Sequence, residues 1–300
     1  MGIGYYLQFG FAQHALEAAF LVAAICGLIG PFVITRSMAF AVHGTSELAF
    51  TGAVGGLLVA DDAVAGALIG AVVVAGLIGA LGRRASERDS TIGVILAAGL
   101  GLGVYLLGFY KGYASEALNI LFGNIFGVSS AQLILLVGIA IAVAGAMALL
   151  WRPLLFASVD PAVAQARGVP TGLLGLLFLF VLAITVTEAA QLVGTLLVLS
   201  LAITPAAAAQ RLSVSPFRVS LLSVAIAVLS AEGGLLLSFQ FASIRPSVLI
   251  VAISFAFYVV ARLVGPSRLA RQRNRIAAAA RPTVGDLAEL SHGERPSDAG

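Results

Sequence analysis

Long apolar segments separated by short polar turns make up most of the chain as far as residue 264. About 20 apolar residues in a helix are enough to cross the hydrocarbon core of a bilayer. Taken in order from the N-terminus, the predicted spans cover residues 11–34, 38–60, 64–81, 91–107, 131–150, 173–187, 191–209, 219–239 and 247–264. The pattern therefore predicts an all-α integral membrane protein, a polytopic bundle of about nine transmembrane helices.

The positions of the arginines predict the orientation of this bundle. Cytoplasmic loops of membrane proteins carry an excess of lysine and arginine. When the loop with Arg83, Arg84 and Arg88 is placed in the cytoplasm, the other loop arginines fall on the same side, and only Lys111 and Arg245 fall outside. The sequence therefore predicts the N-terminus outside and the C-terminus in the cytoplasm.

Two segments depart from the pattern of spans. Residues 118–128 are apolar but too few to cross a bilayer, so they predict a re-entrant or interfacial helix. Residues 266–300 are rich in arginine, alanine and proline and predict a cytoplasmic, basic, disordered tail. Residues 1–265 then form one transmembrane domain.

The composition agrees with a membrane protein. Hydrophobic residues make up 60% of the chain and charged residues 10%, whereas a soluble domain has about 25% charged residues. The single cysteine, Cys26, excludes an intrachain disulfide framework and a cysteine-rich metal site. We expect membrane lipid as the surroundings of this chain and no nucleic-acid partner.

His43 and Glu47 stand four residues apart inside the second predicted span. On a helix this spacing places both side chains on one face. An ionisable pair at membrane depth is costly and marks a candidate functional site. Phe40, Gly44 and Thr51 lie near the same face, where the small residues leave room for a second helix or a ligand. Imidazole and carboxylate together suit a divalent transition metal; the alternative is a structural hydrogen bond that fixes helix packing.

Other polar residues are weaker candidates for the metal path or its gates. His14 and Glu17 lie near the outer end of the first span and suggest a role in metal entry. Glu188, with Gln191, is predicted at the outer turn between the sixth and seventh spans, where a carboxylate stays solvated and can contribute to a gate. Glu232 is deeper and has no obvious local partner, so we expect it to pair with an arginine or to be protonated.

A short polar helix is predicted on the cytoplasmic side between the fifth and sixth spans. Asp160 suits its N-cap and Pro161 its first turn, while Gly168 suits its C-terminal cap. Gln165 and Arg167 are polar residues of the same segment. Two interpretations are open, an ordinary interfacial helix or a docking helix for a cytoplasmic partner.

These segments together resemble the membrane permease subunits of bacterial ABC importers for zinc, manganese and iron. The second span of that family has a motif similar to Gly-Asp-x-x-x-His-x-x-x-Pro-Gly. Residues 42–52 fit this frame, with His43 at the Asp position, Glu47 at the His position and Thr51 at the Pro position. The resemblance covers residues 10–264 and continues through residues 121–129, 160–169 and 193–207. A nitrogen and a carboxylate ligand are thus kept in reversed order.

The resemblance implies a multi-pass permease in the cytoplasmic membrane of a bacterium. Its cargo would be a divalent metal (zinc, manganese or iron), with no permanently bound cofactor, and a separate ATPase subunit would drive transport. Two permeases and two ATPases would form the importer, and an extracytoplasmic metal-binding protein would deliver the metal. The segment from Asp160 to Gly168 looks like the coupling helix that docks into the ATPase.

The chain itself lacks a nucleotide site of the usual kind. Such a site needs a glycine-rich loop with Gly-Lys-Ser/Thr, and the only lysine, Lys111, is followed by Gly112 and is predicted outside. The chain is therefore not expected to be an enzyme. One alternative is a proton-coupled secondary metal transporter, although no inverted repeat is visible. An intramembrane metalloprotease would need three zinc ligands, and no His-Glu-x-x-His motif occurs among the three histidines, one of which, His292, lies in the tail.

Overall fold

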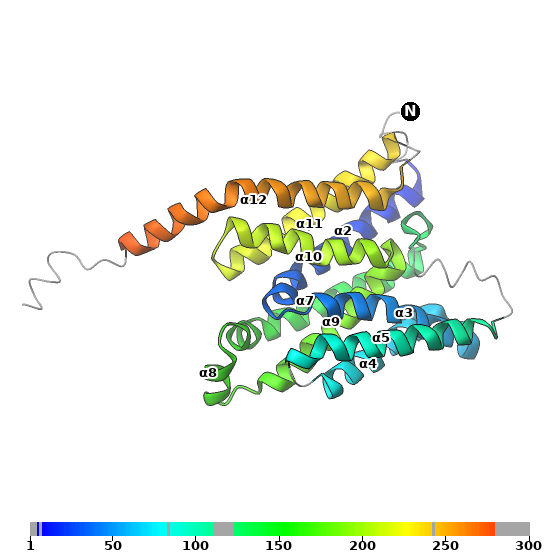
Figure 1. The fold of residues 1–300 in the computed structure, drawn as a ribbon. Helices are drawn as coiled ribbons and strands as arrows, with labels where there is room; N and C mark the ends of the chain where they lie inside the picture. Colours follow the sequence, from blue (N-terminus) through cyan, green and yellow to red (C-terminus); the bar gives the residue numbers. More distant parts are fainter. Residues whose placement is uncertain (1–4, 6–7, 83–84, 111–122, 242–243, 280–300) are drawn as a thin grey trace, which may run out of the picture.

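The structure, a computed structural model, describes residues 5, 8–82, 85–110, 123–241 and 244–279. Within these residues it is helical and contains no strand (Figure 1). In chain order the elements are α2 (Gly10–Thr35), α3 (Ala39–Ala60), α4 (Ala63–Leu81), α5 (Ala85–Leu107), η1 (Ile125–Gly127), α7 (Ser130–Val159), α8 (Pro161–Ala166), α9 (Thr171–Val193), α10 (Thr195–Leu212), α11 (Pro216–Gln240) and α12 (Pro246–Ala279). The predicted polytopic all-α class is confirmed.

Each predicted span overlaps one of these helices. Seven helices of the described chain are long and apolar enough to cross a membrane: α2, α4, α5, α7, α9, α11 and α12. The helix α3 is not among them, and the apolar part of α10 is shorter, from Leu197 to Leu212. The number of nine spans and the orientation of the termini therefore stay predictions.

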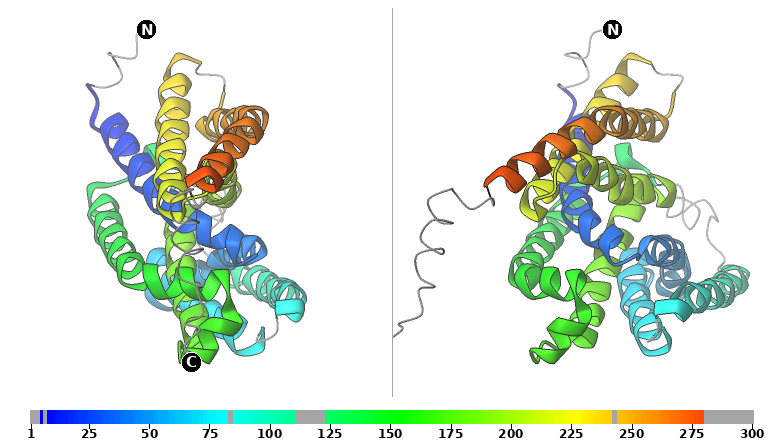
Figure 2. Two further views of the ribbon diagram at one scale, coloured as in Figure 1. Left: turned by 90° about the vertical axis from the view of Figure 1, so that its left-hand side faces the viewer. Right: turned by 60° about the vertical axis from the view of Figure 1, so that its left-hand side comes forward.

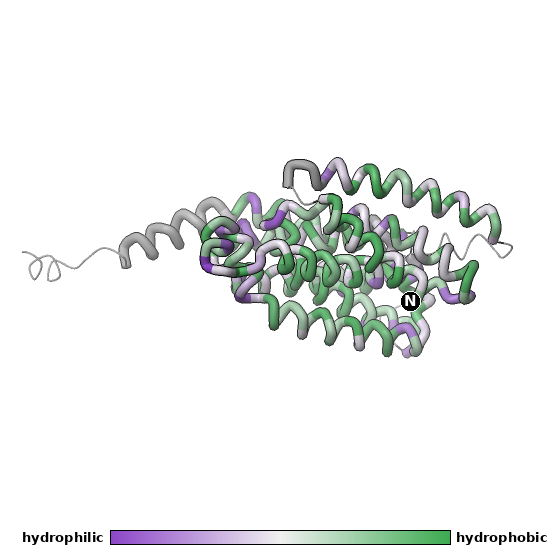
Figure 3. Tube along the Cα trace, turned by 90° about the horizontal axis from the view of Figure 1, so that it is seen from below, coloured by the Kyte–Doolittle hydropathy of each residue, from purple (hydrophilic) through white to green (hydrophobic). Residues whose placement is uncertain are grey.

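Different helices and helix ends lie at the two ends of the bundle. Figure 1 shows α8 and the C-terminal end of α12 at one end, and the start of α2 at the other. Hydrophobic residues run along the helices, and most strongly hydrophilic stretches lie toward the ends (Figure 3). This arrangement agrees with helices that cross a bilayer roughly in parallel and expose their polar turns on both sides.

The helices form two groups, one packed on α2 and the other on α9. Figure 2 shows α3, α4 and α5 side by side in one part of the bundle and α10, α11 and α12 together in another. The helix α2 packs against α7, α10 and α11, and much of its surface is buried, including the single cysteine Cys26. Free cysteine packs as a small hydrophobe, and Cys26 is buried in this way.

Glycines allow α3 and its neighbours to approach closely. A Cβ atom added at Gly52 would lie 2.6 Å from the carbonyl oxygen of Gly66 on α4, and one at Gly70 would lie 2.8 Å from the Cα of Gly52. On α5, a Cβ at Gly103 would lie 2.6 Å from Thr51 Oγ1. Small residues let helix backbones approach in this way, so these glycines allow α3 to pack closely against α4 and α5.

Two helices extend beyond the predicted spans. The predicted fifth span ends at residue 150, but α7 continues through Pro153 to Val159, because Trp151 and Leu154 on either side of the proline pack into the core. The predicted ninth span, residues 247–264, agrees with the apolar stretch Pro246–Gly265, and α12 itself continues to Ala279, since alanine and arginine favour helix. The first part of the predicted disordered tail is thus helical, and residues 280–300 lie outside the described chain.

The predicted re-entrant segment has only a small described part. Within residues 123–128 the chain forms a single 3-10 turn, η1, rather than a longer helix. Gly123, with φ +69°, precedes this turn and packs so tightly against the α9–α10 junction that its added Cβ would meet the backbone of Gly194. The remainder of the predicted segment, and Lys111, lie outside the described residues.

Candidate metal-transport site

His43 and Glu47 lie on one face of α3, as their spacing predicts. Their Nε2 and Oε1 atoms are 3.4 Å apart, and the side chains are 32% and 24% exposed. The ring centroid of Phe40, one turn earlier, lies 6.1 Å from that of His43, and Phe40 is itself exposed. The helix α3 therefore presents an imidazole and a carboxylate, in contact with each other, on a face that the rest of the chain leaves partly open.

The small residues near the pair pack against the neighbouring helix α5. A Cβ at Gly44 would lie 2.7 Å from Ile92 Cγ2 on α5, and Thr51 Oγ1 donates a hydrogen bond of 2.8 Å to the carbonyl oxygen of Gly99 on the same helix. These contacts attach one side of α3 to α5. Thr51 lies one turn after Glu47 on the same face, so the contact with α5 lies next to the pair, whose side chains remain partly exposed.

The pair alone is an incomplete metal site. A structural zinc site has about four protein ligands, whereas the described residues contain no group of three or more histidine, cysteine, aspartate or glutamate side chains that could hold a metal. A metal at His43 and Glu47 would therefore complete its coordination with water or with ligands from another chain. The imidazole must be neutral and the carboxylate ionised to bind it.

Glu188 is not in a solvated turn, so that prediction is wrong. The break between the two helices falls at Gly194, whose φ of +90° and ψ of 150° suit glycine, and Glu188 lies within the last turns of α9. It is 2% exposed, and its Oε2 atom, like Thr187 Oγ1 and Gln191 Nε2, is buried without a hydrogen-bond partner among the described residues. These polar atoms of α9 are therefore closed to solvent in the described chain.

Glu17 and Glu232 line the same cavity, which the sequence did not predict. The cavity has a volume of about 420 Å³ and its other lining residues are the apolar Leu16, Phe20, Leu21, Leu133 and Val137. Glu17 is exposed and His14 is half-buried, as expected near a helix end. Glu232 Oε1 is buried without a hydrogen-bond partner, and no ion pair with an arginine forms in the described part of the chain. The lining does not include His43 or Glu47.

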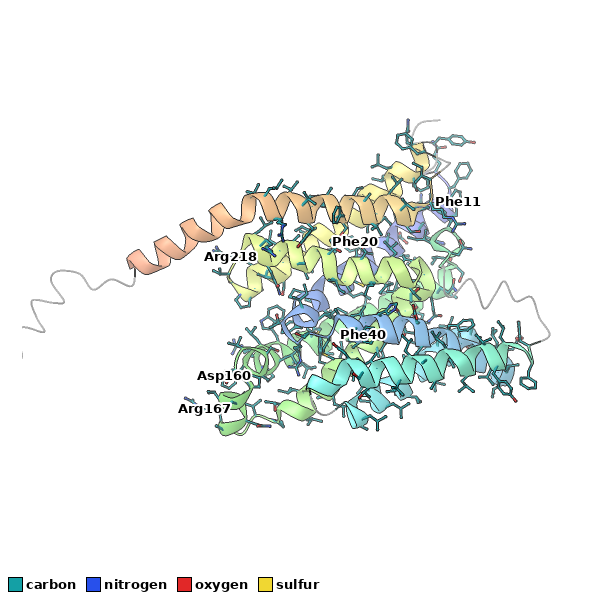
Figure 4. All side chains as sticks on the ribbon, in the orientation of Figure 1. Phe11, Phe20, Phe40, Asp160, Arg167 and Arg218 are labelled. Atoms are coloured by element: carbon teal, nitrogen blue, oxygen red, sulfur yellow. The ribbon has the colours of Figure 1, made fainter. Side chains whose placement is uncertain are left out.

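The short helix predicted between the fifth and sixth spans forms as α8. The Asp160 side chain accepts a hydrogen bond of 3.0 Å from the Val163 amide, Pro161 occupies the first turn of α8, and Gly168 has φ +79°. Gln165 Nε2 donates to Thr171 Oγ1 at 3.2 Å. Figure 4 shows Asp160 and Arg167 at the same end of the bundle as Arg218 and opposite Phe11.

One contact between the turn that precedes α3 and the last turn of α7 was missed by sequence reasoning. Arg36 Nη1, in the turn before α3, donates a hydrogen bond of 3.2 Å to Ser158 Oγ, two residues before the cap of α8. The two residues are 122 positions apart in the chain, so only the tertiary structure brings them together. The lone arginine next to a predicted span was the available signal, and it was interpreted only as a cytoplasmic charge.

Comparison with known families decides what kind of protein carries this site. The sequence model of ABC-3, the ABC 3 transport family, matches residues 8–265. The chain belongs to the ABC 3 transport family. With its apolar helices, this member of the ABC 3 transport family is a multi-pass protein of the bacterial inner membrane.

Several members of the ABC 3 transport family are similar over most of their length. The "Manganese transport system membrane protein MntC" of Halalkalibacterium halodurans is 34% identical over 253 residues, which are 83% of this chain and 87% of that protein. The "High-affinity zinc uptake system membrane protein ZnuB" of Haemophilus influenzae is 28% identical over 258 residues, 85% and 97% of the two chains. Among solved structures, "PsaBC from Streptococcus pneumoniae in complex with Fab" matches with a TM-score of 0.78 and 27% identity, over 89% of this chain and 97% of that one.

Proposed function

We propose that this chain is the membrane permease subunit of an ABC importer for a divalent transition metal, driven by ATP hydrolysis in a separate subunit. The partly exposed His43–Glu47 pair in a chain of the ABC 3 transport family is the observation that carries this proposal. The similar proteins from H. halodurans and H. influenzae are named for manganese transport and zinc uptake. The sequence has no Gly-Lys-Ser/Thr loop for ATP, which fits a division of labour between subunits.

The pair would bind the metal between two copies of the chain. Each copy offers one nitrogen and one carboxylate on a partly open face, so a homodimer would bring four ligands to one point, the number that zinc prefers. With only two ligands from each chain, the metal can also leave readily, which transport requires. His14, Glu17, Glu188 and Glu232 remain candidates for further positions on the path or its gates.

Manganese and zinc are the favoured cargoes. Imidazole binds both metals, and a carboxylate suits the harder manganese ion. The names of the relatives described above contain manganese and zinc. Iron stays a prediction from the resemblance in sequence.

The two ends of the bundle would contact different partners. The helix α8, with Asp160, Pro161, Gln165, Arg167 and Gly168, would dock into the ATPase, because it is a short capped helix that projects from one end of the bundle (Figure 4). An extracytoplasmic metal-binding protein would deliver the metal at the opposite end, where α2 begins.

Metal uptake by cells that express the complete importer tests this function. Zinc, manganese and iron are supplied separately, and the importer is compared with one whose ATPase cannot hydrolyse ATP. We expect uptake of manganese or zinc that disappears with the inactive ATPase and persists when the proton gradient is collapsed. Uptake that needs the gradient but not the ATPase would instead support a secondary transporter.

A further inference from the structure

A groove opens on the side of the bundle formed by α2, α7 and α11. It has a volume of about 590 Å³ and is lined mainly by apolar side chains from all three helices, among them Leu28, Met147 and Val224. Beneath it α2 and α11 are in contact, since a Cβ at Gly27 would lie 2.7 Å from the Cα of Val224. The groove shares no residue with the pair on α3 or with the cavity at Glu17 and Glu232.

The groove combines a long apolar wall with one charged group. Ala144 and Ala148, one helical turn apart on α7, are both exposed and keep the wall shallow. Arg152 follows one turn later and also lines the groove. Arginine side chains of this kind place their alkyl part on apolar surface and their charge toward the polar layer.

The depth of Arg152 along α7 matches the edge of the hydrocarbon core. The helix begins at Ser130, and at 1.5 Å per residue Arg152 lies about 33 Å further along. The hydrocarbon core is about 30 Å thick. If α7 crosses the membrane from its first residue, Arg152 lies at the level of the lipid phosphates, and the apolar part of the groove lies at the level of the acyl chains.

Aromatic side chains form the mouth of the groove at the depth of Arg152. The Trp151 ring lies edge-on to Phe32 of α2, with centroids 5.1 Å apart, and to Phe217 of α11, with centroids 6.5 Å apart. Tryptophan is enriched at membrane–water interfaces. Phe217 and Trp151 therefore connect the three helices next to Arg152 and keep the mouth of the groove in a fixed shape.

Arg152 is not neutralised within the described chain. Its residue is exposed, and no carboxylate of the described residues forms an ion pair with it. A basic group beside a groove between membrane helices on the cytoplasmic side attracts anionic headgroups. The predicted orientation places Arg152 on that side.

We propose that this groove is a binding site for one anionic phospholipid. The phosphate of the headgroup would contact the Arg152 guanidinium beside Trp151, and an acyl chain would lie along Leu28, Ala144 and Val224. The apolar wall, the aromatic mouth and the unpaired cation occur together along the groove. Their order matches that of the acyl chain, the glycerol region and the phosphate of a phospholipid. This face of a membrane protein is surrounded by lipid, so the proposed occupant is a lipid rather than a soluble anion.

Native mass spectrometry of the purified full-length chain in detergent tests the site. Phosphatidylglycerol or phosphatidylcholine is added, and bound lipids are counted for the wild type, for Arg152→Gln and for Ala148→Phe, which fills the groove without removing the charge. Arg262→Gln is the matched control, because Arg262 is exposed on α12 and does not line the groove. Size-exclusion chromatography confirms that each variant is folded.

We expect one phosphatidylglycerol to stay bound to the wild type and to Arg262→Gln, and phosphatidylcholine to bind more weakly. Occupancy should fall about fivefold in Arg152→Gln, the effect of one charge near an anionic lipid, and should be lost in Ala148→Phe. Equal binding of both lipids, or unchanged phosphatidylglycerol in both groove variants, would overturn the proposal. A change of oligomeric state in Ala148→Phe without a change in bound lipid would also overturn it and assign the groove to a second copy of the chain.

Discussion

Glu47 and Glu188 are both carboxylates within apolar helices, but their surroundings differ. Glu47 is 24% exposed and lies 3.4 Å from His43. Glu188 is 2% exposed, and its Oε2 atom has no hydrogen-bond partner among the described residues. A carboxylate that has a second ligand beside it and an open side can exchange water for metal. A carboxylate enclosed by apolar helices cannot do so without a rearrangement of the helices.

An ionisable residue at membrane depth can bind an ion or can serve helix packing, and the comparison distinguishes these two roles. Such residues are functional candidates by default, but the presence of a second ligand and access to the surface decide which candidate can carry an ion. We therefore place the transport site at His43 and Glu47 and expect Glu188 to act mainly in helix packing.

The largest expected effect comes from removal of the metal ligands. His43→Ala and Glu47→Gln should each lower metal uptake about tenfold or more, the equivalent of one lost ligand interaction of about 1.4 kcal/mol. Uptake is measured in cells that express the complete importer, with membrane levels checked by immunoblot. Asp61→Asn is the control, because Asp61 is an exposed carboxylate at the end of the same helix whose φ of +55° asparagine tolerates. Normal uptake by both ligand variants would show that the pair only fixes helix packing.

A smaller effect is expected when the turn between α2 and α3 loses its hydrogen bond to the last turn of α7. Arg36→Gln removes the charged donor to Ser158, so we expect the metal transported per ATP hydrolysed to fall up to about tenfold. Uptake and ATP hydrolysis are measured together in proteoliposomes. Arg218→Gln, an exposed arginine at the same end of the bundle, should leave the ratio unchanged. An unaltered ratio in Arg36→Gln would limit this contact to a structural role.

Exchange of the two ligands should have a milder effect than their removal. The double variant His43→Glu with Glu47→His keeps one nitrogen and one carboxylate on the same face of α3. We expect it to retain a substantial share of wild-type uptake, within about tenfold, and to change the preference between manganese and zinc. Loss of uptake as complete as in the single variants would mean that the order of the ligands is required.

The smallest effect is expected at Glu188. Glu188→Gln keeps the shape of the side chain and removes a charge that has little solvation in its buried position. Uptake should stay within about twofold of wild type, and the melting temperature of the purified chain should be equal or higher. A strong loss of uptake with an unchanged melting temperature would move Glu188 onto the metal path and erase the difference from Glu47.

Much of this arrangement follows from local sequence patterns. The spacing of His43 and Glu47 predicted their contact, and the Asp160-Pro161 pair with Gly168 predicted α8, because capping and helical periodicity depend on a few neighbouring residues. The α9–α10 boundary was predicted wrongly because a glutamate was expected to mark the solvated turn. The break between the two helices instead lies at Gly194, which has a positive φ.

Contacts between segments that are distant in the sequence could not be predicted from local patterns. Glu17 and Glu232 belong to α2 and α11, and their common cavity exists only because these helices pack together. Likewise, Arg36 meets Ser158 across 122 positions of the chain. Both cases depend on helix packing, which a hydropathy pattern does not specify.

The amount of metal bound by the assembled importer tests the central claim most directly. The purified complex of the full-length chain with its ATPase is equilibrated with manganese or zinc, and bound metal is measured by mass spectrometry together with the oligomeric state. We predict one metal per two copies of the chain in the wild type and in Asp61→Asn, and almost none in Glu47→Gln. One metal per single copy, or unchanged binding in Glu47→Gln, would contradict a site shared between the His43–Glu47 pairs of two chains.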